Sequence, residues 1–194
     1  MGNLYQVKEK LTELSKFTDY NLSELKKIVT QLGEKVDLNS YLVTYFNYSL
    51  SISHHVSGEN IIIADYNIWN LSNQTLENPF ICIKLSSGAP FIFNGKYFYS
   101  DSNQQLKAPD AWERFNDKNN KEEYWLRPHQ HTVIKPFEKI SFKNFQIKWS
   151  QESSYAGSVI GFTYCDQLKD GVTSLNQINI SGSKPEQGEL SERY

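Results

Sequence analysis

The chain has 194 residues, 14% of them aromatic, and a formal net charge of -2 at pH 7. This length suits one domain with an appendage, and a charge so near zero excludes long-range attraction to nucleic acid or anionic lipid. We therefore expect no nucleic-acid partner and no membrane partner. No apolar run approaches the roughly 18 residues of a membrane-spanning helix, and the N-terminus lacks the apolar core of a signal peptide, so we expect a cytoplasmic location.

Residues 1–37 predict an amphipathic, coiled-coil-type α-helix. Apolar residues recur there at alternating three- and four-residue spacing, which is typical of a coiled-coil seam. The predicted contact residues are Leu4, Val7, Leu11, Leu14, Asn21, Leu25, Ile28 and Leu32. Asn21 either fixes the register of such a seam or caps a second helix, with Glu24 as its capping-box partner. The apolar stripe must be covered by a second copy of the chain or by its own β-domain, and we expect self-association into a homo-oligomer.

Near residue 38 the apolar period changes to two, the period of a strand that buries one face. Phe46–Ser53 alternates apolar and polar residues without a fault. Ile61–Trp69 and Phe80–Leu85 are apolar, β-branched runs joined by a turn-forming segment. The residues predicted to share the core face of the first of these two runs are Ile62, Ala64, Tyr66 and Ile68.

Three further features lie between residues 94 and 149. Asn94-Gly95, between two short aromatic runs, predicts a hairpin with a type I′ turn. Residues 101–121 are polar and irregular, and we expect a long loop in which Ala111–Phe115 forms one helical turn. In Lys139–Trp149 the apolar phase shifts near Lys143-Asn144, which indicates a β-bulge.

About eight to ten short strands with turns at this spacing are typical of an antiparallel β-sandwich. The sequence therefore predicts a mainly-β fold with a sandwich domain over residues 38–182. Residues 183–194 are polar and contain Pro and Gly, so we expect a disordered tail.

Two stretches resemble motifs of bacterial immunoglobulin-like repeat domains. Tyr66–Pro79, read YNIWNLSNQTLENP, is similar to their N-x-G-N-x-T-L-x-N turn. Val133–Phe142, read VIKPFEKISF, is similar to their L-x-P-G-E-x-x-x-F segment, with Phe137 where that family commonly has Gly. The resemblance implies an immunoglobulin-like β-sandwich that serves as a binding or spacing module, and it implies no catalytic residues.

Cys82 and Cys165 both lie in strand-like runs. They could form a disulfide between the two sheets or remain as buried free thiols. Because we expect a reducing compartment, we favour free thiols.

Two sets of residues are candidates for a ligand site. His129 and His131 would share one face of a strand, a geometry that suits a metal, but a zinc site needs at least one further ligand. Trp69 and Trp112 are candidates for an exposed sugar-binding surface, because the first lies opposite the predicted core face and the second in the long loop. No nucleophile–base motif and no phosphate-binding loop is present, so we expect neither an enzyme nor a cofactor.

The sequence thus predicts a non-enzymatic protein-interaction or scaffold module. It would self-associate through its N-terminal helix and bind an unidentified protein partner on the β-sandwich. A carbohydrate-binding module that uses Trp69 and Trp112, and a metal-binding protein that uses His129 and His131, are the alternatives.

Overall fold

The computed structural model describes residues 41–53, 58–99, 111–129, 132–150 and 153–183, together with Lys10, Ser23 and Lys27. The chain divides into two units, Met1–Asp37 and Leu38–Tyr194. In the first unit only the three single residues are described, each in helical conformation, so the predicted N-terminal helix is not supported as an element. Within the described residues, no helix has the length and apolarity needed to cross a membrane.

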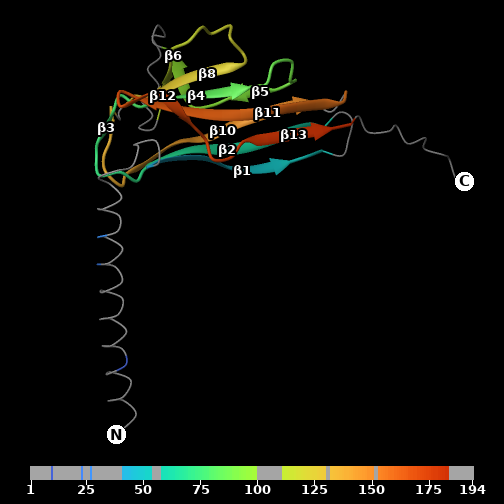
Figure 1. Cartoon of the computed structure of the whole chain (residues 1–194). Coiled ribbons are helices and arrows are strands. Elements are labelled where there is room, and N and C mark those ends of the chain that lie inside the picture. Colours follow the sequence, from blue (N-terminus) through green and yellow to red (C-terminus); the bar gives the residue numbers. More distant parts are fainter. Residues whose placement is uncertain are drawn as a thin grey trace, which may run out of the picture. The chain divides into compact units, whose positions relative to one another are not determined.

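The described part of the second unit is built of β-strands (Figure 1). In chain order they are β1 (Leu42–Ser51), β2 (Glu59–Asn70), β3 (Leu76–Glu77), β4 (Phe80–Leu85), β5 (Ile92–Asn94), β6 (Tyr97–Tyr99), β7 (Trp112–Arg114), β8 (Glu123–Pro128), β9 (Val133–Ile134), β10 (Lys139–Ser150), β11 (Tyr155–Cys165), β12 (Leu168–Thr173) and β13 (Ile178–Gly182). The predicted mainly-β fold is confirmed.

The strands form a β-sandwich. One sheet is four-stranded, in the order β1-β2-β10-β5. The other is seven-stranded, in the order β12-β11-β4-β8-β7-β6, and β13 also pairs with β11. A short ladder of β3 with β9 completes the described strands. Every described pair is antiparallel except β6 with β7.

The core lies between the two sheets, and the period-two pattern of the sequence predicts its residues. Ile62, Ala64, Tyr66 and Ile68 of β2 are all buried, as expected. The residues that meet them include Ile81 and Ile83 of β4, Leu126 of β8, Phe142, Phe145 and Trp149 of β10, and Val159 of β11. A buried hydrogen bond of 2.9 Å between the Tyr66 hydroxyl and Thr163 Oγ1 links the two layers.

The predicted bulge in β10 is confirmed. The register of β10 against β2 shifts between Phe142 and Phe145, and Asn144 has a φ of 55°. The Asn144 N–H donates a 2.8 Å hydrogen bond to Asp65 Oδ1. Because the bulge adds one residue, Phe142 and Phe145 both point into the core.

The two stretches that resemble immunoglobulin-like repeat motifs meet in space. The Asn70 side-chain amide donates hydrogen bonds to the carbonyls of Gln74, Ile134 and Lys135. Its Oδ1 accepts bonds from the N–H and the hydroxyl of Ser72. One buried Asn therefore closes the turn after β2 and holds it against β9. These contacts support a β-sandwich.

Two predictions of local structure are wrong. Asn94-Gly95 does not close a hairpin, because β5 pairs with β10 in one sheet and β6 pairs with β7 in the other. The chain crosses between the layers there, and a Cβ at Gly95 would lie 2.6 Å from Phe142 Cζ, so close packing requires the glycine. Ala111–Phe115 forms no helical turn: Trp112–Arg114 is β7, which bridges β6 and β8.

Candidate functional site

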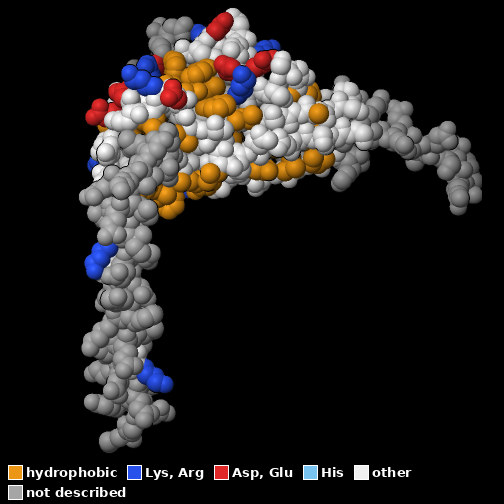
Figure 2. Space-filling model, viewed as in Figure 1, with side chains coloured by type: hydrophobic (Ala, Val, Ile, Leu, Met, Phe, Trp, Pro, Cys, Tyr) orange, Lys and Arg blue, Asp and Glu red, His pale blue; other side chains and the backbone are white. Residues whose placement is uncertain are grey.

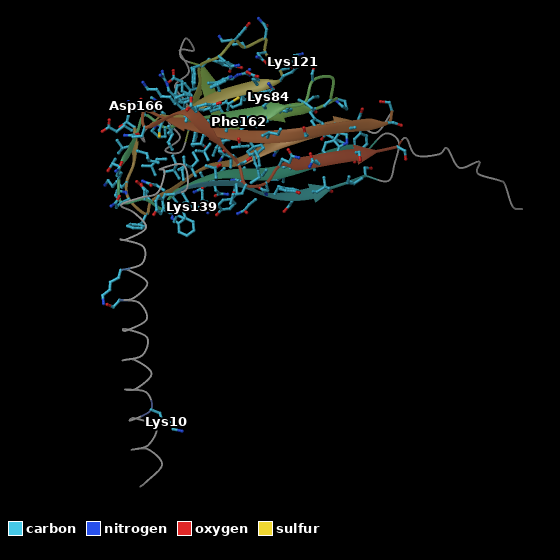
Figure 3. The ribbon with its side chains drawn as sticks, in the orientation of Figure 1. Lys10, Lys84, Lys121, Lys139, Phe162 and Asp166 are labelled. Atoms are coloured by element: carbon cyan, nitrogen blue, oxygen red, sulfur yellow. The ribbon has the colours of Figure 1, made fainter. Side chains whose placement is uncertain are left out.

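The outer face of the seven-stranded sheet carries a cluster of aromatic rings. In β4, Ile81 and Ile83 point into the core, so the alternate residues Phe80, Cys82 and Lys84 point outward. Register places Trp125 of β8 opposite Cys82, and Tyr164 of β11 opposite Phe80. Figure 2 shows hydrophobic side chains gathered on this part of the surface between acidic and basic groups, and Figure 3 labels Lys84 and Phe162 there.

Four rings on this surface contact one another, and we call them the aromatic face: Phe80, Phe115, Trp125 and Tyr164. Phe80 and Tyr164 are nearly parallel, with ring centroids 5.0 Å apart and an angle of 10°. Trp125 stacks on Tyr164 at 5.5 Å and 28°. Rings at these distances are in contact in an offset-stacked arrangement, so the three side chains form one cluster.

Phe115 differs from the other three rings. It follows β7, stands edge-on to Phe80 at 84° with centroids 5.8 Å apart, and is 44% exposed. It is held in place by a 3.1 Å hydrogen bond from its N–H to the carbonyl of Trp125. Phe115 is thus the most accessible ring of the aromatic face, and its backbone is fixed to the sheet.

Cys82 lies between its cross-strand neighbours Trp125 of β8 and Phe162 of β11. Its side chain points outward, yet the residue is only 3% exposed. Burial raises the pKa of Cys82 to about 12, and the nearby Glu123 carboxylate adds to this increase. The thiol is therefore protonated and shielded at neutral pH, which does not suit a nucleophile.

Both cysteines are free and buried, as the sequence predicts. Cys82 is directly opposite Phe162 in β11, so Cys165 falls on the other face of the same sheet. Side chains on opposite faces of one sheet cannot meet, and this excludes a disulfide between the two residues.

Ion pairs border the aromatic face. Arg127 Nε and Nη2 bind the two carboxylate oxygens of Glu113 at 2.7 and 2.9 Å. Lys84 Nζ lies 2.9 Å from Glu123 Oε1, and the Trp125 indole N–H donates a 3.0 Å hydrogen bond to Glu123 Oε2. The hydrogen bonds from Trp125 and Lys84 lower the pKa of Glu123. The border is therefore charged but locally neutral.

A cavity of about 500 Å³ adjoins the aromatic face. Phe80 and Phe115 supply part of its apolar wall. The polar wall includes the Glu113–Arg127 pair and Asp166, whose Oδ2 accepts a 2.6 Å hydrogen bond from the side-chain amide of Asn78. An apolar surface with a few polar groups around a concavity is the usual form of a recognition site.

Arg114 positions the loop next to Phe115. It is 3% exposed, and its guanidinium carbon lies 4.2 Å from the ring centroid of Tyr124. It donates hydrogen bonds to the carbonyls of Asp117, Asn120 and Glu123, to Asn116 Oδ1 and to the Tyr99 hydroxyl. One buried cation thus gathers the carbonyl groups of the loop between β7 and β8. This loop fixes the end of β7 from which Phe115 projects.

The structure separates the two predicted tryptophans. Trp69 lies on the outer face of the four-stranded sheet and is exposed, as expected, with its indole N–H 3.4 Å from the carbonyl oxygen of Phe137. Trp112 is not at the surface: it is 4% exposed and packs edge-on against Phe142 at 5.5 Å. The expectation that Trp112 contributes to a binding surface is corrected, because its place in β7 directs the indole into the core.

The other predicted site residues stay predictions. His129 contacts the ring of Phe98 at 5.0 Å, whereas His131 lies outside the described residues. The described part of the chain contains no group of three or more His, Cys, Asp or Glu side chains that could hold a metal. The predicted contact residues of the N-terminal helix, namely Leu4, Val7, Leu11, Leu14, Asn21, Leu25, Ile28 and Leu32, all lie outside the described residues.

The aromatic face was missed from sequence because its signal is weak. Phe80-Ile-Cys-Ile is apolar on both phases, so the pattern alone does not say which phase is the core. The useful signal is the charge at the end of each run: Lys84 shares a phase with Phe80, and Arg127 shares a phase with Trp125. A charged residue in phase with an aromatic one marks the outer face of a strand.

Comparisons with known proteins give no family. No family model matches the chain, and no curated protein sequence matches it. Among solved structures, the chain is similar to a GH20 exo β-N-acetylglucosaminidase from Vibrio harveyi in complex with N-acetylglucosamine, with 8% identity and a TM-score of 0.29 over 73% of this chain and 17% of that one. It is also similar to a cohesin module of a family 33 glycoside hydrolase from Clostridium perfringens, with 12% identity and a TM-score of 0.35 over 73% of this chain and 97% of that one.

The chain spans only 17% of the length of the glucosaminidase that it matches. At these identities and TM-scores, neither likeness assigns a ligand or an activity to this chain.

Proposed function

We propose that the β-sandwich is a non-catalytic module that binds a partner protein on the aromatic face. The observation that carries this proposal is the cluster of Phe115, Trp125 and Tyr164 beside Arg127 and a cavity of about 500 Å³. Tyr, Trp and Arg account for much of the binding energy in protein–protein interfaces, particularly next to a pocket that an opposing side chain can fill.

The ring geometry supports a protein ligand over a carbohydrate. A sugar ring stacks flat on an open aromatic face. Here the rings of Phe80, Trp125 and Tyr164 pack against one another, with centroids 5.0 to 6.1 Å apart and planes inclined by 10° to 36°. The Arg127 guanidinium carbon lies 5.8 Å from the centroid of the exposed Phe115 ring. A partner that inserts side chains between ring edges and binds the Glu113–Arg127 pair uses this surface better.

The proposal that the module is non-catalytic has its own support. The outward thiol of Cys82 is buried with a raised pKa, and the acidic groups Glu113 and Glu123 are engaged in ion pairs. Self-association through the N-terminal segment and a cytoplasmic location remain predictions from the sequence, independent of the aromatic face.

The test begins with a photo-crosslinking residue at position 115. In an extract of the producing organism, we expect this variant to capture a protein that the same residue at Ile92, exposed on β5, does not capture. The captured protein is then purified and titrated against wild type, Phe115→Ala, Trp125→Ala and Ile92→Ala. Loss of a hot-spot ring costs about 2 kcal/mol or more, so the first two variants should bind roughly 30-fold more weakly, and Ile92→Ala should bind as wild type does.

Two outcomes contradict the proposal. One is a captured partner whose affinity is the same for wild type and for Phe115→Ala, with both proteins folded by circular dichroism. The other is a glycan array on which wild type binds a sugar and Phe115→Ala does not, because that result would make the aromatic face a carbohydrate site.

A further inference from the structure

Strand β1 is an edge strand of the four-stranded sheet, with β2 on one side only. On its other side, the N–H and C=O of Phe46 bind the side-chain amide of Asn176 at 2.8 and 2.9 Å. The carbonyl of Thr44 accepts a 2.8 Å hydrogen bond from the Leu175 N–H. The segment after β12 therefore covers the first half of this edge.

The second half of the edge has no such cover among the described residues. Backbone groups alternate between the two sides of an antiparallel strand, so Tyr48 and Leu50 direct their N–H and C=O to the same side as Phe46 does. The register of β1 against β2 is continuous from Leu42 to Ser51, with no bulge. The described residues offer no hydrogen-bond partner for these groups, so within the described part of the chain the second half of the β1 edge is open.

Apolar side chains line this open edge. Tyr48, Leu50 and Ile52 are 46%, 48% and 37% exposed and lie on one face of the strand. Figure 2 shows hydrophobic side chains along the margin of the sandwich that β1 occupies in Figure 1. From Leu42 to Ser53 the chain has no charged residue, no Pro and no Gly. Edge strands are usually protected from pairing by a Lys, a Pro or a bulge, and β1 has none of these.

We infer that the open half of β1 pairs with the same segment of a second copy of this chain, so that the two four-stranded sheets become one continuous antiparallel sheet. With Leu50 on the twofold axis, Leu50 faces its counterpart, and Tyr48 faces Ile52 of the second copy. Each of these residues exchanges a pair of hydrogen bonds with its opposite.

A second copy fits this edge because the segment is self-complementary. Antiparallel pairing places the apolar row of one copy beside the apolar row of the other, and Ser49 and Ser51 beside each other on the opposite face. Neither copy brings a charge, so no like charges meet. A charged peptide would find no opposite charge on this segment. Because the paired segment is short, we expect weak, concentration-dependent dimerisation.

The test uses the full chain in sedimentation velocity over a concentration series. Wild type should dimerise, and Leu50→Lys should weaken the dimer at least about tenfold, because two ammonium groups would face each other at the axis. Leu50→Pro should do the same, since it removes an N–H that β2 does not use. Ile63→Lys changes an exposed apolar residue on the outer face of the same sheet, and it should leave the dimer unchanged.

A cysteine at position 50 gives a positional readout. In a hydrogen-bonded antiparallel pair the two Cα atoms are about 5.5 Å apart, and the side chains are too widely spaced for an unstrained disulfide but within reach of a short bismaleimide crosslinker. Leu50→Cys should therefore form a covalent dimer with this reagent, and Ile63→Cys should not, since the native Cys82 and Cys165 are buried. A monomeric wild type would overturn the inference. So would self-association that Leu50→Lys and Leu50→Pro leave unchanged, which would place the contact in residues 1–37 or elsewhere.

Discussion

The contact between Tyr66 and Gly161 offers the sharpest test of the two-layer core. The Tyr66 ring is completely buried between the sheets, and its hydroxyl bonds to Thr163. A Cβ added at Gly161 would lie 2.1 Å from Tyr66 Cε2 and 2.8 Å from Cζ. No side chain fits there unless the ring moves. Gly161→Ala must therefore either displace the ring or push β11 away from β2.

The expected cost follows from these contacts. Overpacking a dense core costs typically 1–3 kcal/mol, and a displaced Tyr66 also loses a buried hydrogen bond worth about 1 kcal/mol. We expect Gly161→Ala to lower the free energy of unfolding by about 2–4 kcal/mol, out of a total of roughly 5–15 kcal/mol for a domain. With an m value near 2 kcal/mol per molar urea, the midpoint of unfolding falls by about 1–2 M.

The assay is urea unfolding followed by tryptophan fluorescence, with two controls. Gly88 has a φ of 74° and no atom near its added Cβ, so Gly88→Ala should cost only about 1 kcal/mol of backbone strain. Tyr66→Leu removes the ring, so adding Gly161→Ala to it should cost much less than in wild type. A Gly161→Ala protein within about 0.5 kcal/mol of wild type would refute this packing of the two sheets.

Three further predictions concern charge and backbone strain. Burial raises the pKa of Cys82 from about 9 to about 12, so the unfolded chain loses this proton first. Ionisation of Cys82 should therefore leave the free energy of unfolding unchanged below pH 9 and lower it between pH 9 and 12. Urea titrations at a series of pH values should show a smaller decrease over this range in Cys82→Ala than in wild type. An equal decrease in the two proteins would contradict this prediction. Phe137 is 62% exposed and has a φ of 62°, a conformation that is strained for every residue except Gly. Phe137→Gly should therefore stabilise the protein by about 1 kcal/mol, measured as a higher Tm. A lower Tm would show that the Phe137 ring makes a stabilising contact. Arg114→Lys keeps the charge but loses the planar guanidinium that binds the carbonyls of the loop at 116–123. It should lower the free energy of unfolding by about 2–3 kcal/mol and speed amide hydrogen exchange in that loop. Unchanged exchange would mean that the loop is ordered without Arg114.

Many strands of the sandwich were predictable because a strand that buries one face has apolar residues at every second position. Ile62 to Ile68 shows this, and so does the phase shift at Asn144 that marks the bulge. The Asn94-Gly95 signal misled for a physical reason. Asn-Gly is compatible with a tight hairpin turn and also with a chain segment that crosses between two sheets. Which of the two forms here depends on the pairing of β5 with β10, which lies some fifty residues further along the chain.

The candidate site was harder to predict than the fold. An aromatic residue on a strand looks the same in sequence whether it faces the core, as Trp112 does, or the outer face, as Trp125 does. Phe115 belongs to the site only because a loop held by Arg114 fixes the end of β7 beside β8. Contacts of this kind join segments that no local pattern links.

The central claim is that the aromatic face binds a protein. The most direct measurement is an amide NMR titration of the labelled chain with the purified partner captured at position 115. We expect the largest shift changes in β4, β8 and the end of β7, together with broadening of the Trp125 indole N–H signal. Shift changes confined to the outer face of the four-stranded sheet around Trp69, or none at all at saturating partner, would contradict the claim.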